Sequence, residues 1–333
     1  MTAMKRLSLF LTVLFSLQSL FAQEVTFSVN SGVNDAALQS AIESTVSGFL
    51  TALNQAYEAK GTPDISRIPM TEGAAASVRM LWNNNPFHCD ESDIVEPVIR
   101  TYDGGYQVRN IPLESLDENG KPLYRELVID LDGSGRITRV NKAIEANLYR
   151  KIMQSGSQVT DLRQRQIILN YVEDFRTSYE KKDIDFLDMV FSDDALIITG
   201  KVVQRKKGER SIQMKPEITY TKYSKQEYLN RLRNHVFPNT KTIDVTFGTV
   251  EVVKHPSIEG YFGVLVRQGY KSVFKSGAIY EDDGYLFMLW DFRDESHPQI
   301  HVRTWQPYWM NEAKTESISE DQIININSFR ITR

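Results

Sequence analysis

The stretch from Gly277 to Pro307 constrains the fold more than any other part of the chain. It reads GAIYEDDGYLFMLWDFRDESHPQIHVRTWQP, with many aromatic residues and tight turn signals between the apolar runs. Alternation along such runs predicts strands with two different faces. We therefore expect the last strands of a sheet at 285–293 and 299–306. A sheet with one apolar face needs a second layer to cover it.

The residues from 161 onward supply that second layer. Apolar side chains recur at helical spacing from Ile167 to Tyr179, which predicts a long helix over 161–182. A short helix, a turn at Asp193-Asp194 and a strand, ALIITGKVV, follow. Ser224 and Glu227 form a capping box for the next helix. Strands over 241–254 and 261–274 then lead into the final stretch.

The first half of the chain repeats the order of helix and then sheet with a different sequence. A helix over 35–60, a shorter one over 71–82 and three strand-like runs up to 142 are predicted from periodicity and turn residues. We therefore expect an α+β protein of two domains. The predicted segments are a signal peptide (1–22), an N-terminal domain (23–150), a linker (151–160), a C-terminal domain (161–310) and an extension (311–333).

The N-terminus predicts export. Lys5 and Arg6 precede a short apolar run that ends at Ala22, which is the pattern of a cleaved secretory signal; an uncleaved anchor is the alternative. No second apolar run follows, so no membrane span is expected in the mature chain, and a periplasmic or extracellular location is expected. Cys89 is the only cysteine and excludes an intramolecular disulfide.

Charge argues against nucleic acid as a partner. The whole chain has 39 Lys and Arg against 43 Asp and Glu, a net charge of -4. Removal of Lys5 and Arg6 with the signal gives 37 − 43 = -6. Nucleic-acid binding requires a basic excess that this chain lacks.

The segment YEKKDIDFLDMVFSDDALIITG and the aromatic final strands resemble the nuclear transport factor 2-like superfamily over about residues 161–309. The resemblance implies a cone of curved antiparallel sheet packed on helices. Its mouth would be an enzyme pocket, a ligand pocket or a docking surface, and a homodimer would form through the open sheet face. The chain also resembles uncharacterised secreted two-domain proteins of gut and oral Bacteroidetes.

Enzymes of this fold place an Asp, often with Tyr, His or Arg, inside an apolar cone. The candidates in this sequence are Asp291, His301, Arg303, Tyr270 and Tyr280. Strict alternation puts His301, Arg303 and Trp305 on one face of their strand, so a pair of Asp291 with Arg303 or His301 is expected. Such a pair is more often structural than catalytic. A catalytic role requires Asp291 or His301 to point into an apolar pocket.

Five aromatic residues, Trp290, Phe292, Trp305, Tyr308 and Trp309, are candidates for packing or for binding. Trp290 and Phe292 are expected to fill the space between sheet and helices. Trp305 and Trp309 flank Pro307 and are expected at the rim of the cone, where they would contact a ligand or partner. Together with Tyr270 and Tyr280, the three tryptophans Trp290, Trp305 and Trp309 form the predicted binding set.

Neither metal-like motif in the sequence is convincing. DLDGSG at 130–135 imitates a calcium loop, but strands flank it and the twelfth position is Asn141, so a hairpin turn is predicted. The cluster from His88 to Glu91 has no partner cluster at ligand spacing. We expect no metal and no cofactor. The basic run at Arg205, Lys206, Lys207 and Arg210 reads as a solvated hairpin tip, with contact to anionic envelope polymers as the alternative.

These observations favour an exported, non-catalytic binding or assembly module that recognises an envelope protein or ligand through the cone and rim of the C-terminal domain. One alternative is an isomerase, dehydratase or cyclase that uses Asp291 or His301. The other is a carrier of a small apolar molecule.

Overall fold

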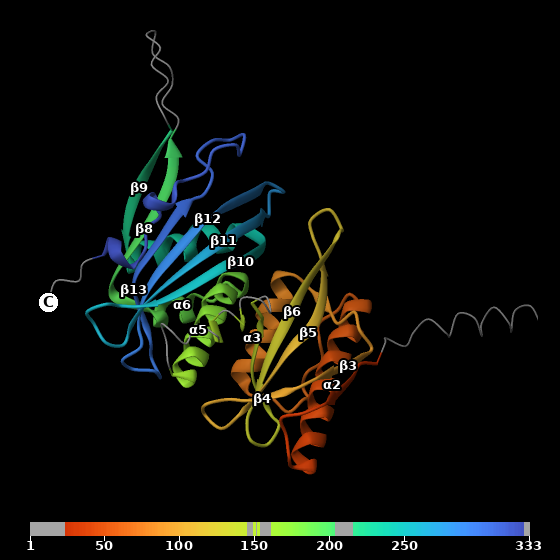
Figure 1. The fold of residues 1–333 in the computed structure, drawn as a ribbon. Coiled ribbons are helices and arrows are strands. Elements are labelled where there is room, and N and C mark those ends of the chain that lie inside the picture. The colour runs from red at the N-terminus through yellow and green to blue at the C-terminus, as the bar shows by residue number, and fades with distance from the viewer. Residues whose placement is uncertain (1–23, 145–148, 151, 154–160, 204–215, 330–333) are drawn as a thin grey trace, which may run out of the picture. The chain divides into compact units, whose positions relative to one another are not determined.

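The computed structural model describes residues 24–144, 149–150, 152–153, 161–203 and 216–329 (Figure 1). The expected signal peptide, most of the expected linker at 151–160 and the basic residues at 205–210 lie outside these ranges. The chain divides into two compact units, Met1–Val140 and Asn141–Arg333, and each is described by itself. In the described ranges, no helix is both long and apolar enough to cross a membrane.

The first unit has the predicted order of helices and then sheet. Its helices are α2 (Ala36–Glu58) and α3 (Glu72–Asn84). Strands β1 (Thr26–Val29) and β3 (Asp93–Glu96) pair in parallel. The larger sheet has the order β2-β5-β6-β7, with β4 also paired to β5. Its strands are β2 (Phe87–His88), β4 (Val98–Arg100), β5 (Tyr106–Leu116), β6 (Pro122–Leu131) and β7 (Ile137–Lys142).

Local signals in the first unit act as predicted. Asp35 caps α2 by accepting hydrogen bonds from the N–H groups of Ala37 and Leu38 at 2.8 and 2.9 Å. The segment from Asp132 to Gly135 is the turn between β6 and β7, and Gly135 has φ +81°. The hairpin interpretation of DLDGSG is therefore confirmed. The described residues hold no group of three or more His, Cys, Asp or Glu side chains placed to bind a metal.

The second unit begins with α5 (Leu162–Lys181) and α6 (Ile184–Val190), which Asp161 and Asp183 cap. Strand β8 (Phe191–Val203) follows, then β9 (Glu217–Ser224) and α7 (Lys225–Arg231), whose capping box of Ser224 and Glu227 is confirmed. A π-helical segment (Leu232–Val236) and a 3-10 turn (Phe237–Asn239) lead into the last strands. These are β10 (Thr240–Lys254), β11 (Tyr261–Phe274), β12 (Ile279–Asp291) and β13 (Gln299–Pro307), followed by 3-10 turns at Glu320–Gln322 and Ile326–Ser328.

The sheet of this unit curves over its helices, as Figure 1 shows. Its strand order is β10-β11-β12-β13-β8-β9, and all neighbours are antiparallel except β13 and β8, which are parallel. The order and layering confirm the predicted α+β class and are those of the nuclear transport factor 2-like fold. One turn prediction is wrong: Asp193 and Asp194 lie inside β8, because the strand starts directly where α6 ends.

The two faces of this sheet have separate cores. We call the face packed on α5, α6 and α7 the inner face; Val264, Met288 and Trp290 are among its buried residues. The opposite outer face carries a smaller cluster that includes Phe287 and Ile326 of the C-terminal extension. The extension therefore covers part of the outer face. Dimerisation through that face stays a prediction.

Helix α5 buries charged groups as well as apolar ones. The Glu180 carboxylate lies 2.5 Å from the Lys142 ammonium and 3.7 Å from the Arg176 guanidinium, and all three side chains are buried. Arg176 also donates from Nε to the carbonyl of Val245 on β10 at 2.6 Å. Buried charges are stable only when they are paired in this way. The network connects α5 to β10 and so holds this helix against the inner face.

Candidate functional site

Strand β12 brings the predicted aromatic residues to the inner face in the predicted alternation. Leu286, Met288, Trp290 and Phe292 all belong to the inner core, and Trp290 and Phe292 are 0% and 2% exposed. The packing role expected of these two aromatics is confirmed. Tyr270 on β11 packs against the same core.

A bulge in β13 changes the faces predicted for that strand. The pairing register of β13 with both β12 and β8 shifts between Ile300 and Val302. Ile300 and Trp305 therefore pack in the inner core, whereas Val302 packs in the outer one. A bulge inserts one residue and so reverses the alternation beyond it.

The predicted common face of His301, Arg303 and Trp305 is therefore wrong. Arg303 lies on the inner face, over the ring of Tyr228 on α7. His301 lies on the outer face, where its Nε2 is 3.6 Å from Asp291 Oδ2. The predicted pair of Asp291 with Arg303 is also wrong, and the alternative pair with His301 is present.

Arg303 lies among three tyrosines on the inner face. We call this group the arginine–tyrosine cluster. Its members are Arg303, Tyr179 on α5, Tyr228 on α7 and Tyr270. Arg303 is 6% exposed, and its Cζ lies 5.3 Å from the centre of the Tyr228 ring. The hydroxyls of Tyr179 and Tyr228 share a hydrogen bond of 2.7 Å. Burial acts to lower the pKa of Arg303, but the three tyrosines outweigh it and the pKa is raised. The guanidinium therefore stays charged inside the unit.

Two buried donors on the inner face have no hydrogen-bond partner among the described residues. They are Nε of Arg303 and Nε1 of Trp290. Buried polar groups in folded proteins are nearly always satisfied, so each exception needs a physical explanation. Both donors come from neighbouring strands of the same face, at positions two residue pairs apart in the ladder.

A second group, which we call the mouth group, lies toward the exposed end of the same face. Asp282 Oδ2 accepts hydrogen bonds from the Tyr280 hydroxyl at 2.8 Å and from the Trp305 indole at 3.1 Å. Gly284 lets the indole reach this far, because a Cβ there would lie 2.9 Å from two indole carbons. Burial raises the pKa of Asp282, and its hydrogen bonds offset that effect only in part. Tyr280 is 48% exposed and marks the solvent side of the group.

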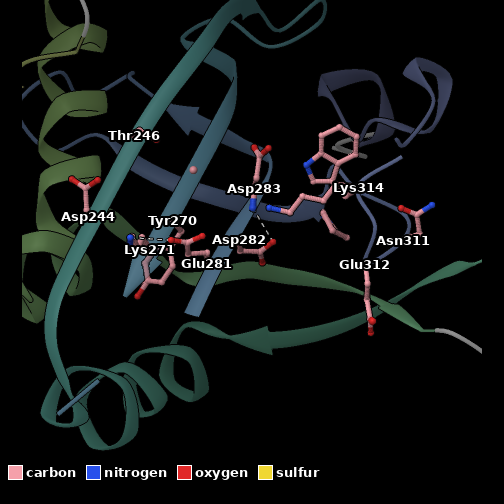
Figure 2. A pocket seen from close by; sticks show the side chains of 13 residues that line it. Asp244, Thr246, Tyr270, Lys271, Glu281, Asp282, Asp283, Asn311, Glu312 and Lys314 are labelled. Atoms are coloured by element: carbon pink, nitrogen blue, oxygen red, sulfur yellow. Dashed lines mark hydrogen bonds and ion pairs between the residues drawn. The ribbon is translucent and has the colours of Figure 1, made fainter. Parts of the chain in front are cut away.

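A cavity of about 300 Å³ lies beside the mouth group (Figure 2). Residues of β10, β11 and β12 line it together with the segment from Pro307 to Lys314, which includes Trp309. Tyr270 and Asp282 are among its lining residues, but Asp244, Thr246, Lys271 and Asp283 alternate with inner-face residues and so belong to the outer face. Trp309 therefore lies at a cavity wall, while Trp305 is 7% exposed and lies on the inner face.

The outer-face group around His301 joins four strands. His301 Nδ1 is 3.2 Å from the hydroxyl of Ser192 and 3.5 Å from Asp194, both on β8. Its Nε2 is 3.4 Å from the hydroxyl of Tyr261 on β11, in addition to Asp291 on β12. The requirement for catalysis by Asp291 or His301, a side chain that points into the apolar interior, is not met.

Asp291 is further held by Arg293, whose Nη2 lies 2.6 Å from Asp291 Oδ2. Burial acts to raise the pKa of Asp291, but hydrogen bonds from Arg293 and Tyr261 outweigh it, and the pKa is lowered. A carboxylate held in its ionised form in this way is a poor proton donor near neutral pH. The geometry suits a structural tie between strands.

Three residues of the inner face were not predicted from the sequence as parts of a site. They are Asp282, Tyr179 and Tyr228. For Asp282 a signal existed. Counting back from Trp290 in steps of two places Asp282 and Tyr280 on the same face. Nothing in the sequence indicates that a helix tyrosine would meet Arg303, because that contact depends on tertiary packing.

Comparisons with known proteins give similarities of structure only. No protein-family model matches the chain, and no curated protein sequence matches it. Similar solved structures include a nuclear transport factor 2-like superfamily protein from Salmonella enterica serovar Typhimurium, with 11% identity, 43% of this chain and 89% of that chain covered, and a TM-score of 0.32.

Two further similar structures come from other bacteria. One is a nuclear transport factor 2-like protein from Cytophaga hutchinsonii, with 13% identity, coverage of 43% and 98%, and a TM-score of 0.33. The other is hexachlorocyclohexane dehydrochlorinase LinA-type3 from Novosphingobium barchaimii, with 11% identity, coverage of 45% and 90%, and a TM-score of 0.34. None of these similarities assigns an activity to this chain.

Proposed function

We propose that this protein is a non-catalytic binding protein that takes up a small molecule in the cavity beside strands β10, β11 and β12 of its second unit. The observation that carries the proposal is the cavity of about 300 Å³ lined by Tyr270, Asp282 and Trp309. A cavity of this volume is within the range of small-molecule sites. Its lining is mainly charged, with Tyr270 and Trp309 as its aromatic residues. Export, with the mature protein in the periplasm or outside the cell, is part of the proposal and rests on the N-terminal sequence.

Blocking the cavity tests this function. Thr246 lines the cavity, whereas Thr242, four pairs earlier on β10, does not. A thermal-shift screen with neutral, anionic and cationic small molecules should give hits with the wild-type protein. Thr246→Phe should lose them and Thr242→Phe should keep them, because only the first ring enters the cavity. If no molecule raises the melting temperature, or if both variants bind equally, the proposal fails.

Asp282 favours a second candidate function, proton transfer on the bound molecule. Its raised pKa and its hydrogen bond from Tyr280 are features of a general acid or base. In that case a bound molecule would be converted, and Asp282→Asn would abolish turnover but keep binding. Product analysis of each hit from the screen separates the two functions.

A further inference from the structure

We propose that the outer face of the sheet in the second unit is an interaction surface that the chain covers with its own segment from Ser319 to Phe329. We call this segment the C-terminal strap. While it is in place, the strap keeps a second copy of the chain from docking on the same face. No strap residue lines the cavity, so the inference is independent of the proposed function.

The sheet surface beneath the strap is apolar. Phe287 on β12 and Val302 on β13 are buried, and they form one cluster with Ile326 of the strap. Two further strap residues, Ile324 and Phe329, pack against this cluster. A mostly antiparallel sheet that packs on helices with one face usually presents a solvated, polar second face. The apolar residues on this second face therefore indicate a surface that is built to be covered.

The strap fits this surface closely. The ring of Phe329 stacks on the ring of Phe287, with the ring centres 5.6 Å apart and the ring planes 5° apart. Gly263 on β11 leaves the space that Ile326 fills, because a Cβ at this glycine would lie 3.1 Å from Cβ and Cδ1 of Ile326. The 3-10 turn at Ile326–Ser328 sets the spacing of the two strap side chains. Close packing of this kind is a property of folded interiors and specific interfaces, not of a loose tail.

One buried side chain of the sheet holds the backbone of the strap. Gln306 on β13 is 1% exposed. Its Nε2 donates to the carbonyl of Gln322 at 3.0 Å, and its Oε1 accepts from the N–H of Ile324 at 2.6 Å. The same Nε2 also donates to the hydroxyl of Tyr220 at 2.6 Å. Loss of the strap would remove two of these three partners, and a buried polar group without its partners costs free energy. Gln306 therefore fixes the position of the strap on the sheet.

The strap can leave the sheet without breaking it. Among the described residues, the strap contributes no strand to the sheet of the second unit. A segment held by a few side chains detaches at a lower cost in free energy than global unfolding. Detachment would expose a continuous apolar patch that includes Phe287, Leu289 and Val302, and such patches promote association. A second copy of the chain carries the same patch, so a two-fold symmetric contact is the association that we expect.

A single charge in the strap tests the inference. Ile326→Asp places a carboxylate in the apolar cluster and should displace the strap, whereas Asn327→Asp places the same group at an exposed position of the same turn. In sedimentation velocity at increasing protein concentration, the wild type and Asn327→Asp should keep one sedimentation coefficient. Ile326→Asp should form a species of about twice their mass, as for a two-fold dimer. Leu265→Glu, which adds a charge to the outer face itself, should abolish that species when it is combined with Ile326→Asp.

Two results would overturn the inference. One is that Ile326→Asp sediments like the wild type at every concentration, because the uncovered face would then not bind a second copy. The other is that the wild type forms a dimer that Leu265→Glu abolishes, because the face would then be shared between copies despite the strap. If Ile326→Asp does not fold, Phe329→Ser removes only the ring that stacks on Phe287 and carries the same expectation. The thermal-shift screen reads the cavity separately, so failure of either proposal leaves the other standing.

Discussion

Replacing Gly284 by alanine tests how the mouth group is built. A Cβ at this position would lie 2.1 Å from the backbone oxygen of Gln306 and 2.9 Å from two ring carbons of Trp305. The oxygen belongs to β13, which pairs with β12 at Gly284 and Pro307. It cannot move away without local loss of that pairing. We therefore expect destabilisation of about 3 kcal/mol, at the upper end of the usual cost of overpacking.

Gly248 on β10 supplies a matched control. A Cβ there would meet its nearest atom, in Arg267, at 3.5 Å, which is ordinary van der Waals contact. Gly248→Ala should therefore leave stability unchanged or raise it by up to about 1 kcal/mol, because alanine restricts the unfolded chain. Both variants have the same change in composition, so any difference between them reports the local geometry.

Urea unfolding followed by tryptophan fluorescence is the assay for this pair. Three of the four tryptophans, Trp290, Trp305 and Trp309, belong to the second unit, so the signal mainly follows that unit. The reasoning is refuted if Gly284→Ala unfolds at the same urea concentration as Gly248→Ala. It is also refuted if Gly284→Ala leaves the fluorescence of the folded protein unchanged, because the indole of Trp305 must shift.

Four further predictions address other parts of the chain. Glu180→Gln should cost about 3 kcal/mol in urea unfolding, because it leaves Lys142 buried without its partner. Burial raises the pKa of Asp282, so the wild type should lose stability relative to Asp282→Asn as pH rises from the ordinary carboxyl range through the raised pKa; denaturation at several pH values checks the sign. Burial raises the pKa of Cys89 to about 11, so a thiol reagent at about pH 8 should label the folded protein slowly and the unfolded protein fully. N-terminal sequencing of exported protein should give Gln23 as the first residue; an intact Met1 would contradict cleavage.

The elements that depend on local sequence were predictable. Asp35, Asp161 and Ser224 each cap a helix where the sequence predicts a helix start, because a cap and the first turn are only a few residues apart. The strands of the final stretch follow from alternation in the same way. The parallel pairing of β13 with β8 did not follow, because it joins residues about one hundred positions apart and no short pattern encodes it.

The candidate site was predicted in its residue types and not in its arrangement. Of the predicted binding set, Tyr270, Tyr280, Trp290 and Trp305 lie on the inner face or at its mouth, and Trp309 lines the cavity; their role in binding stays a prediction. Asp291 and His301 do not: Asp291 follows the inner-face Trp290 on β12 and so lies on the outer face, where it meets His301 of β13. The carboxylate that takes the interior position is Asp282, which alternation from Trp290 would have revealed.

The bulge in β13 determines which face of the sheet Arg303 occupies. Without it, regular alternation from Ile300 would place Arg303 on the outer face beside Asp291 and Arg293. There it would be one more exposed ion pair, of the kind that contributes little. With the bulge, the guanidinium enters the tyrosine-lined interior, whereas His301, next to the inner-face Ile300, lies on the outer face in either case. One extra residue in a strand thus moves a charge from the surface of the unit to its interior.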